Sequence, residues 1–196
     1  TQTVAEIIER VEKEGEAVVY ELTEKFDGVK LDDLRLPHED LVAAESELAP
    51  EVKEAIDLAY DNIRRFHEAQ RPQDVELETM PGVRCELRHV ALEAVGVYVP
   101  AGTAPLPSTM LMLGATAQVA GCPRKVLVTP PGSTARGHVS PEIRYAALKC
   151  GVDEVYRAGG AQAVAALALG TENIATVDKI YGPGSSFVTE AKLQVS

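Results

Sequence analysis

The amino-acid sequence predicts an α/β protein in three parts: an N-terminal helical module, a β-hairpin, and a parallel sheet covered by helices. Three observations support this fold class. Apolar residues recur at helical spacing through the first seventy residues, and apolar and polar residues then alternate over residues 73–93. From residue 94 onward, short apolar strands and helices follow one another. We therefore expect three units, covering residues 1–72, 73–93 and 94–196.

Residues 1–72 are predicted to form helices, each with one apolar stripe. The stripe of the first helix consists of Val4, Ile7, Ile8, Val11, Val18 and Leu22. This helix should end at Phe26-Asp27-Gly28, because glycine readily adopts the left-handed conformation that closes a helix. A second helix is expected near residues 39–48. A third should run from Pro50 to about residue 70, since proline suits the first turn of a helix.

Residues 73–93 are predicted to form a connecting β-hairpin. Apolar and polar side chains alternate over residues 75–78 and again over residues 83–88. Pro81-Gly82 separates the two runs and is typical of a tight turn.

Residues 94–196 are predicted to contain four strands, each followed by a helix. The strands are expected at residues 95–99, 125–129, 154–158 and 179–181, and the helices near 107–120, 141–150, 161–169 and from Pro183 onward. Short apolar strands of this kind suit a parallel sheet that is buried on both faces. The four loops that follow the strands should then meet at the carboxyl edge of the sheet, where ligands bind in open α/β folds.

The chain is acidic, with 19 Lys and Arg against 30 Asp and Glu and a formal net charge of -11. This charge disfavours nucleic acid and anionic membrane surfaces as partners. No stretch approaches the roughly twenty apolar residues of a membrane span. The three cysteines, Cys85, Cys122 and Cys150, lie far apart without metal-ligand spacing, which predicts reduced thiols in a cytoplasmic protein.

Two of the loops combine glycine with helix-starting residues. In residues 95–109, Gly102 would let the main chain approach a ligand closely, and Pro107 suits a first helical turn whose free amides favour an anion such as phosphate. Gly159-Gly160 precede Gln162, whose carboxamide can both donate and accept hydrogen bonds. Ordinary βα connections and helix packing explain the same glycines, so both interpretations stay open.

The last loop, residues 182–186, repeats the pattern as Gly-Pro-Gly-Ser-Ser. The hydroxyls of Ser185 and Ser186 could meet a ligand, or they could simply cap the following helix. Neither the GxGxxG pattern nor the GxxxxGK[ST] pattern occurs. A bound dinucleotide would therefore be held by several glycine turns and side chains rather than by one phosphate loop.

The spacing of the remaining residues predicts neither a catalytic nor a metal site. His38, His67, His89 and His138 are isolated from one another, and no cluster of His, Cys and carboxylate residues has metal-ligand spacing. No Ser-His-Asp or Cys-His arrangement can be assigned from spacing.

Several long motifs nevertheless stand in a characteristic order in the second half of the chain: VGVYVPAGTAPLPSTMLM, VAGCPRKVLVTPP, GVDEVYRAGGAQAVAALALGTENIATVDKIYGPG and FVTEAKLQVS. Together they resemble the histidinol dehydrogenase family. The first half agrees more loosely, through LTEKFDGV, NIRRFHEAQ and the hairpin. The resemblance implies that residues 94–196 form an incomplete Rossmann-like NAD-binding domain.

The resemblance also implies an activity and site residues. The family oxidises L-histidinol to L-histidine in two successive NAD-dependent steps through an aldehyde, with a bound zinc, as a homodimer. Its NAD-contacting tyrosine falls on Tyr98, its glutamine on Gln162, and its asparagine on Ser185, where serine is a departure that offers a shorter side chain. Ala101 is a second departure, because the family usually has glycine there.

The family's zinc ligands, substrate contacts and catalytic Glu-His pair lie beyond the helix in which this sequence ends, at Ser196. We therefore expect no catalytic and no metal residues within these 196 residues, and no activity from the chain alone. Its expected partners are NAD, L-histidinol and a second copy of the chain. The alternative is a stand-alone nucleotide-binding or assembly module that kept the half-fold without the chemistry.

Overall fold

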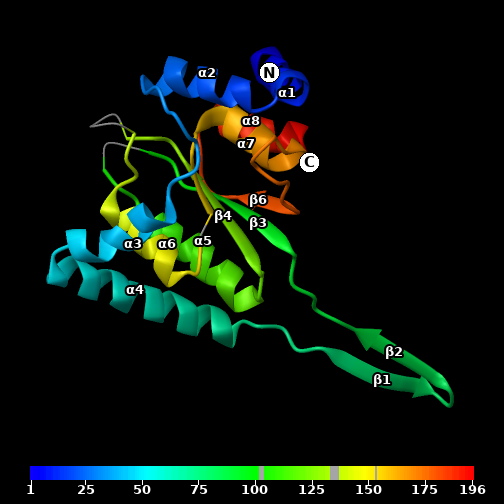
Figure 1. The fold of residues 1–196 in the computed structure, drawn as a ribbon. Helices are drawn as coiled ribbons and strands as arrows, with labels where there is room; N and C mark the ends of the chain where they lie inside the picture. Colours follow the sequence, from blue (N-terminus) through cyan, green and yellow to red (C-terminus); the bar gives the residue numbers. More distant parts are fainter. Residues whose placement is uncertain (102–103, 133–136, 153) are drawn as a thin grey trace.

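A central four-stranded parallel sheet organises the computed structural model, which describes residues 1–101, 104–132, 137–152 and 154–196. The strands are β3 (Ala94–Tyr98), β4 (Arg124–Thr129), β5 (Glu154–Arg157) and β6 (Lys179–Tyr181). They lie in the order β5-β4-β3-β6, and every neighbouring pair is parallel. The sheet separates two layers of helices (Figure 1), so the predicted α/β fold class is confirmed.

Successive residues of the central strand β3 face opposite helical layers. All five of its residues are buried. Val97 packs in the layer that contains α5 (Pro107–Ala120) and α6 (Pro141–Lys149). Tyr98 packs in the layer that contains α7 (Gly160–Leu169) and α8 (Ser186–Gln194). The four predicted strand-helix repeats are confirmed, and the apolar character of the strands follows from their burial on both faces.

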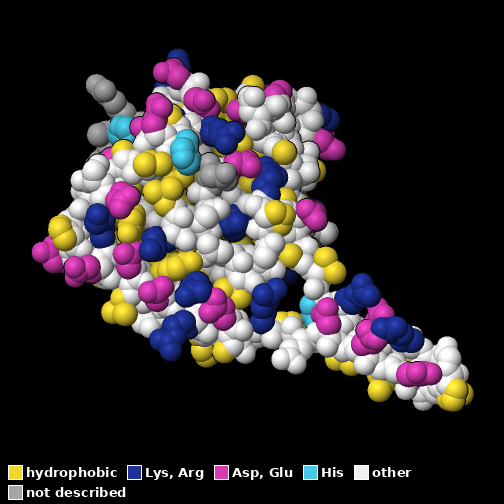
Figure 2. Space-filling view, turned by 60° about the horizontal axis from the view of Figure 1, so that its bottom comes forward, with side chains coloured by type: hydrophobic (Ala, Val, Ile, Leu, Met, Phe, Trp, Pro, Cys, Tyr) yellow, Lys and Arg dark blue, Asp and Glu magenta, His cyan; other side chains and the backbone are white. Residues whose placement is uncertain are grey.

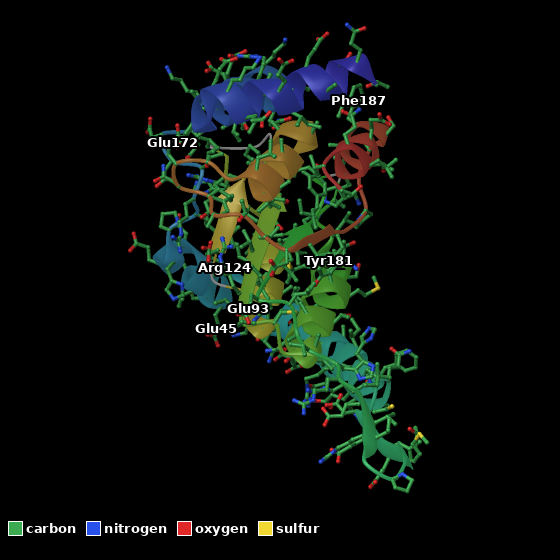
Figure 3. The ribbon with its side chains drawn as sticks, turned by 90° about the vertical axis from the view of Figure 1, so that its right-hand side faces the viewer. Glu45, Glu93, Arg124, Glu172, Tyr181 and Phe187 are labelled. Atoms are coloured by element: carbon green, nitrogen blue, oxygen red, sulfur yellow. The ribbon has the colours of Figure 1, made fainter. Side chains whose placement is uncertain are left out.

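The N-terminal stripe forms two helices, α1 (Gln2–Glu14) and α2 (Glu16–Asp27), so the prediction of a single first helix is wrong. Gly15 breaks it, with φ 66° and ψ -145°. A side chain at Gly15 would collide with the carboxylate of Glu172, which instead accepts a hydrogen bond from the Glu16 backbone N–H at 2.8 Å. Figure 3 shows Glu172 beside the N-terminal helices. The predicted end of α2 at Gly28 is confirmed, with φ 71°.

The other two helices of this region are α3 (His38–Glu47) and α4 (Pro50–Ala69), close to their predicted bounds. They pack against α5 and α6, whereas α1 and α2 pack against α7 and, for α1, against α8. Figure 1 shows the two pairs on opposite sides of the sheet. The expected single helical module is therefore distributed over both faces, and the predicted division of the chain into domains stays a prediction.

The predicted hairpin is confirmed as β1 (Val75–Met80) and β2 (Val83–Leu87), an antiparallel pair that projects away from the sheet (Figure 1). Gly82 supplies the turn with φ 81°. Every residue of both strands is exposed. Figure 2 shows apolar and charged side chains along this projection.

Within the described residues, no helix combines the length and apolar character that a membrane span requires.

Candidate functional site

The carboxyl edge of the sheet contains a point where the chain reverses direction across the strands. From β3 the chain passes to β4 and then to β5 on one side, and it returns to place β6 on the other side of β3. The loops that follow β3 and β6 therefore lead to opposite helical layers. In open α/β sheets, ligands bind in the crevice at such a reversal. Tyr98 is the last residue of β3 and so lies at this position.

The Tyr98 side chain fixes the start of α7. It is 3% exposed, and its hydroxyl oxygen accepts a hydrogen bond from the Gly160 backbone N–H at 3.0 Å. Gly160, the first residue of α7, has φ 65°, a conformation that other residues rarely adopt. Burial raises the pKa of the Tyr98 hydroxyl, which keeps it protonated at neutral pH. The hydroxyl hydrogen consequently remains available as a donor.

Gln162 lies two residues further along α7 and carries an unsatisfied acceptor. The side chain is 1% exposed, yet within the described part of the chain its Oε1 atom has no hydrogen-bond partner. A side chain at Gly160 would place its Cβ only 2.5 Å from that oxygen. An unsatisfied buried acceptor costs about 1–3 kcal/mol. The structure therefore brings Tyr98 and Gln162 to the same helix start and leaves a free acceptor there.

The loop after β6 approaches the end of β3 very closely. Gly182 has φ 133°, and a Cβ on it would lie 2.1 Å from the Tyr98 carbonyl oxygen. The Gly182 carbonyl accepts a hydrogen bond from Lys192 Nζ of α8 at 2.8 Å. Tyr181, the last residue of β6, is labelled in Figure 3. Its hydroxyl donates a hydrogen bond to the Leu113 carbonyl of α5 at 3.1 Å. The glycine at position 182 is thus required by the approach of two backbone segments.

Ser185 acts as the N-cap of α8. Its Oγ atom accepts a hydrogen bond from the Val188 backbone N–H at 3.5 Å, and the residue is exposed. The capping alternative described above is therefore confirmed for Ser185. A ligand contact by the same hydroxyl stays a prediction. Gly102, the glycine expected to approach a ligand, lies outside the described residues, and Ala101 is exposed.

Asp27 is a residue of this region that the sequence analysis did not single out. It ends α2, where the carboxylate meets the negative end of the helix dipole. Burial raises the pKa of its carboxyl group, and within the described residues it has no hydrogen-bond or ion-pair partner. Its charge in turn raises the pKa of Tyr98. An acidic residue at the unfavourable end of a helix was the only signal available in the sequence.

A cavity of about 630 Å³ opens between the loops after β3 and β4. Its lining includes Pro100, Thr129, Pro130, His138 and Arg144. One of these lining residues, Pro130, packs against Gly159, the residue that directly precedes α7. A Cβ on Gly159 would lie only 2.4 Å from Pro130 Cγ. The cavity and the Tyr98 region thus adjoin the same edge of the sheet.

The described residues hold no group of three or more His, Cys, Asp or Glu side chains able to bind a metal ion. Cys122 and Cys150 are buried, and burial raises the pKa of Cys150 to about 12. A thiol with that pKa is not a nucleophile at neutral pH. The site described above therefore offers hydrogen-bonding groups and a cavity, without metal ligands or an activated thiol among these residues.

The whole chain, residues 1–196, matches the family model described as histidinol dehydrogenase. It is 50% identical over 196 residues to a histidinol dehydrogenase of Vibrio parahaemolyticus, and 53% identical over 196 residues to one of Aliivibrio fischeri. Each alignment covers 100% of this chain but 44% and 43% of the respective relative. The chain therefore spans less than half the length of these curated relatives.

A solved structure shows the same fold. The crystal structure of histidinol dehydrogenase from Elizabethkingia anophelis superposes with a TM-score of 0.94 at 39% sequence identity. The superposition covers 99% of this chain and 44% of that chain.

Replacing Asp27 with Asn should stabilise the chain at neutral pH. A carboxyl group whose pKa is higher in the folded than in the unfolded state favours folding at low pH, and this contribution is lost as the pH rises through the two pKa values. Asp27→Asn should therefore raise the urea midpoint at pH 7 and leave it unchanged near pH 3, where both states are largely protonated. Glu24→Gln, on the exposed side of the same helix, is the matched control for the change in net charge. Equal urea midpoints for Asp27→Asn and the parent chain at pH 7 would contradict a raised pKa of the Asp27 carboxyl group in the folded state.

Proposed function

Because the chain belongs to the histidinol dehydrogenase family, a family of oxidoreductases, we propose that the carboxyl edge of its sheet binds NAD. The observation that carries this proposal is the buried, unsatisfied Oε1 of Gln162 beside the start of α7. A hydroxyl or amide of the cofactor would donate to that oxygen. Gln162 thus supplies at this edge the acceptor that a dinucleotide ligand requires.

Tyr98 and the two glycine turns support the same proposal. The Tyr98 hydroxyl already accepts from Gly160 and retains its hydrogen to donate to a ligand oxygen. Gly182 brings the loop after β6 against the end of β3, which keeps bulky side chains out of the crevice. Ser185 offers a further hydroxyl at the start of α8. When bound, NAD supplies the hydride acceptor of an alcohol or aldehyde oxidation.

The full activity that we propose is that of the family: oxidation of L-histidinol to L-histidine in two NAD-dependent steps through an aldehyde, in histidine biosynthesis. Zinc is the metal implied, but the described residues do not fit it, because they contain no metal-binding group. The relatives are more than twice as long as this chain, and we place the zinc ligands and catalytic acid-base residues in the part that these residues do not cover. A cytoplasmic location is part of the same proposal.

We also propose that the chain assembles with a second copy of itself through the hairpin. The register of β1 and β2 places Val75, Leu77, Cys85 and Leu87 on one face of the hairpin, and Glu76 with Glu86 on the other. Within the described residues this apolar face is exposed. Apolar faces of this kind are commonly buried in protein interfaces.

Gln162→Leu should separate ligand binding from stability. The substitution removes the unsatisfied acceptor at nearly constant volume, so the free energy of unfolding should stay the same or rise. Loss of a hydrogen bond should weaken NAD binding roughly tenfold. Isothermal titration calorimetry and urea unfolding measure the two effects.

The matched control is Gln118→Leu on α5. Gln118 already accepts a hydrogen bond from the Tyr60 hydroxyl at 2.5 Å, so its replacement should lower stability and leave NAD affinity unchanged. Equal NAD affinity in Gln162→Leu and the parent chain would refute the proposed hydrogen bond between NAD and Gln162 Oε1. Failure of the parent chain to bind NAD would contradict the proposal that the carboxyl edge of its sheet binds NAD.

The 196-residue chain should not oxidise L-histidinol, because its described residues contain no metal-binding group and the proposed catalytic groups lie outside it. With L-histidinol, NAD and added zinc, absorbance at the NADH wavelength should stay at the level of a sample without protein. Sustained NADH formation that depends on the chain would place the catalytic groups within these residues. NAD binding without any longer partner would favour the stand-alone nucleotide-binding module.

Sedimentation analysis should show an oligomer of this chain. Leu77→Lys puts a charge on the apolar face of the hairpin and should shift the population toward the monomer, because burying an unpaired charge in an interface is costly. Glu76→Lys changes the opposite face and should leave the distribution unchanged. A parent chain that sediments as a monomer at all concentrations would contradict the interface.

A further inference from the structure

The cavity at the carboxyl ends of β3 and β4 stands where a doubly wound sheet holds the adenosine half of a dinucleotide. In such sheets a carboxylate near the end of the second strand accepts hydrogen bonds from the adenosine ribose. Here the second strand is β4, which ends at Thr129 and is followed by Pro130 and Pro131. The end of this strand therefore lacks the acidic residue.

The carboxylates that line the cavity come instead from α3, as Asp40 and Glu47. Glu47 is already engaged, because its two oxygens accept hydrogen bonds from both terminal nitrogens of Arg144. Arg144 also holds the pKa of the Glu47 carboxyl below its usual range. Asp40 is different. Its backbone carbonyl accepts from Arg144, whereas its carboxylate has no hydrogen-bond or ion-pair partner within the described residues.

Arg144 is not available to a phosphate group in this cavity. The residue is 6% exposed, and its side chain donates to the carbonyl oxygens of Val139 and Asp40 as well as to Glu47. Among the described residues, the charged side chains that line the cavity are one occupied cation, Arg144, and the two carboxylates of Asp40 and Glu47, and the exposed His138 is also part of the lining. A ligand that carries an extra phosphate here would meet net negative charge.

We propose that Asp40 accepts hydrogen bonds from the adenosine ribose hydroxyls of the dinucleotide and thereby selects NAD over NADP. This proposal rests on the NAD site described above. Arg144 positions Asp40 by donating a hydrogen bond to its backbone carbonyl. Arg144 also neutralises the Glu47 carboxylate, so that of these two carboxylates only that of Asp40 is free to bind a ligand. The 2′-phosphate of NADP would replace a hydrogen-bond donor with an anion next to that carboxylate. Helix α3, which lies outside the sheet, thus supplies the ribose-binding carboxylate that other doubly wound sheets carry near the end of their second strand.

The test compares dissociation constants for NAD and NADP at one fixed salt concentration, because salt screens the repulsion. The parent chain should prefer NAD at least tenfold, and Asp40→Asn should reduce this preference to about threefold or less. Glu39→Gln makes the same charge change one residue earlier, at an exposed position outside the cavity lining, and should keep the preference of the parent chain. Thermal melting confirms that each variant is folded.

The outcomes separate the two proposals. If the parent chain binds NAD and Asp40→Asn retains the full preference, the role of Asp40 is overturned and the NAD site stands. If the parent chain binds neither dinucleotide, both proposals are overturned. A loss of preference in Glu39→Gln equal to that in Asp40→Asn would show a general charge effect and would also overturn the role of Asp40.

Discussion

The contacts of Tyr98 are the constraint on which the geometry of the carboxyl edge depends. Its hydroxyl binds the first amide of α7, and its carbonyl oxygen lies where a side chain on Gly182 would stand. One residue at the end of the central strand therefore sets the positions of the loops that follow β5 and β6. Tyr98 is buried, and Gly160 and Gly182, which lie against it, both have positive φ, a conformation that other residues rarely adopt.

The carboxyl edge of the sheet must bind an anionic ligand in the proposed function, although the chain itself is acidic. The chain carries a net charge of -11, yet its proposed ligand is anionic. Within the part of the chain that the structure describes, two cations near the site are already bound: Lys192 to the Gly182 carbonyl, and Arg144 to Glu47 and two carbonyls. The proposed contacts to the ligand therefore come from the neutral Gln162 carboxamide and Tyr98 hydroxyl and from the free carboxylate of Asp40, rather than from cations. Asp27, whose charge raises the pKa of Tyr98, is itself held where burial and the helix dipole both oppose that charge.

The sequence predicted the sheet well and the helical layers less well. Short apolar strands and glycine or proline at the loop ends specify β3 to β6 and their helices locally. The break at Gly15 was missed because the apolar stripe continues across it, and the carboxylate that would collide with a side chain there belongs to the distant Glu172. The stripes of α1 to α4 show which side of each helix is buried but carry no information on which face of the sheet receives it. The double glycine at the start of α7 pointed to Gln162 and a family resemblance pointed to Tyr98, whereas the free carboxylate of Asp40 depends on tertiary contacts that local sequence does not reveal.

An NMR titration of the isotope-labelled chain with NAD shows whether a dinucleotide binds at the carboxyl edge beside Tyr98. We expect saturable shifts of the Gly160 amide, the Gln162 side-chain amide and the backbone around Gly182, because Gly160 lies beside the free acceptor of Gln162 and both glycines lie against Tyr98. The amides of the hairpin, which projects away from the sheet, should keep their positions. Saturable shifts confined to the hairpin or to the outer helices, with the Gly160 and Gln162 signals unmoved, would contradict dinucleotide binding at this edge.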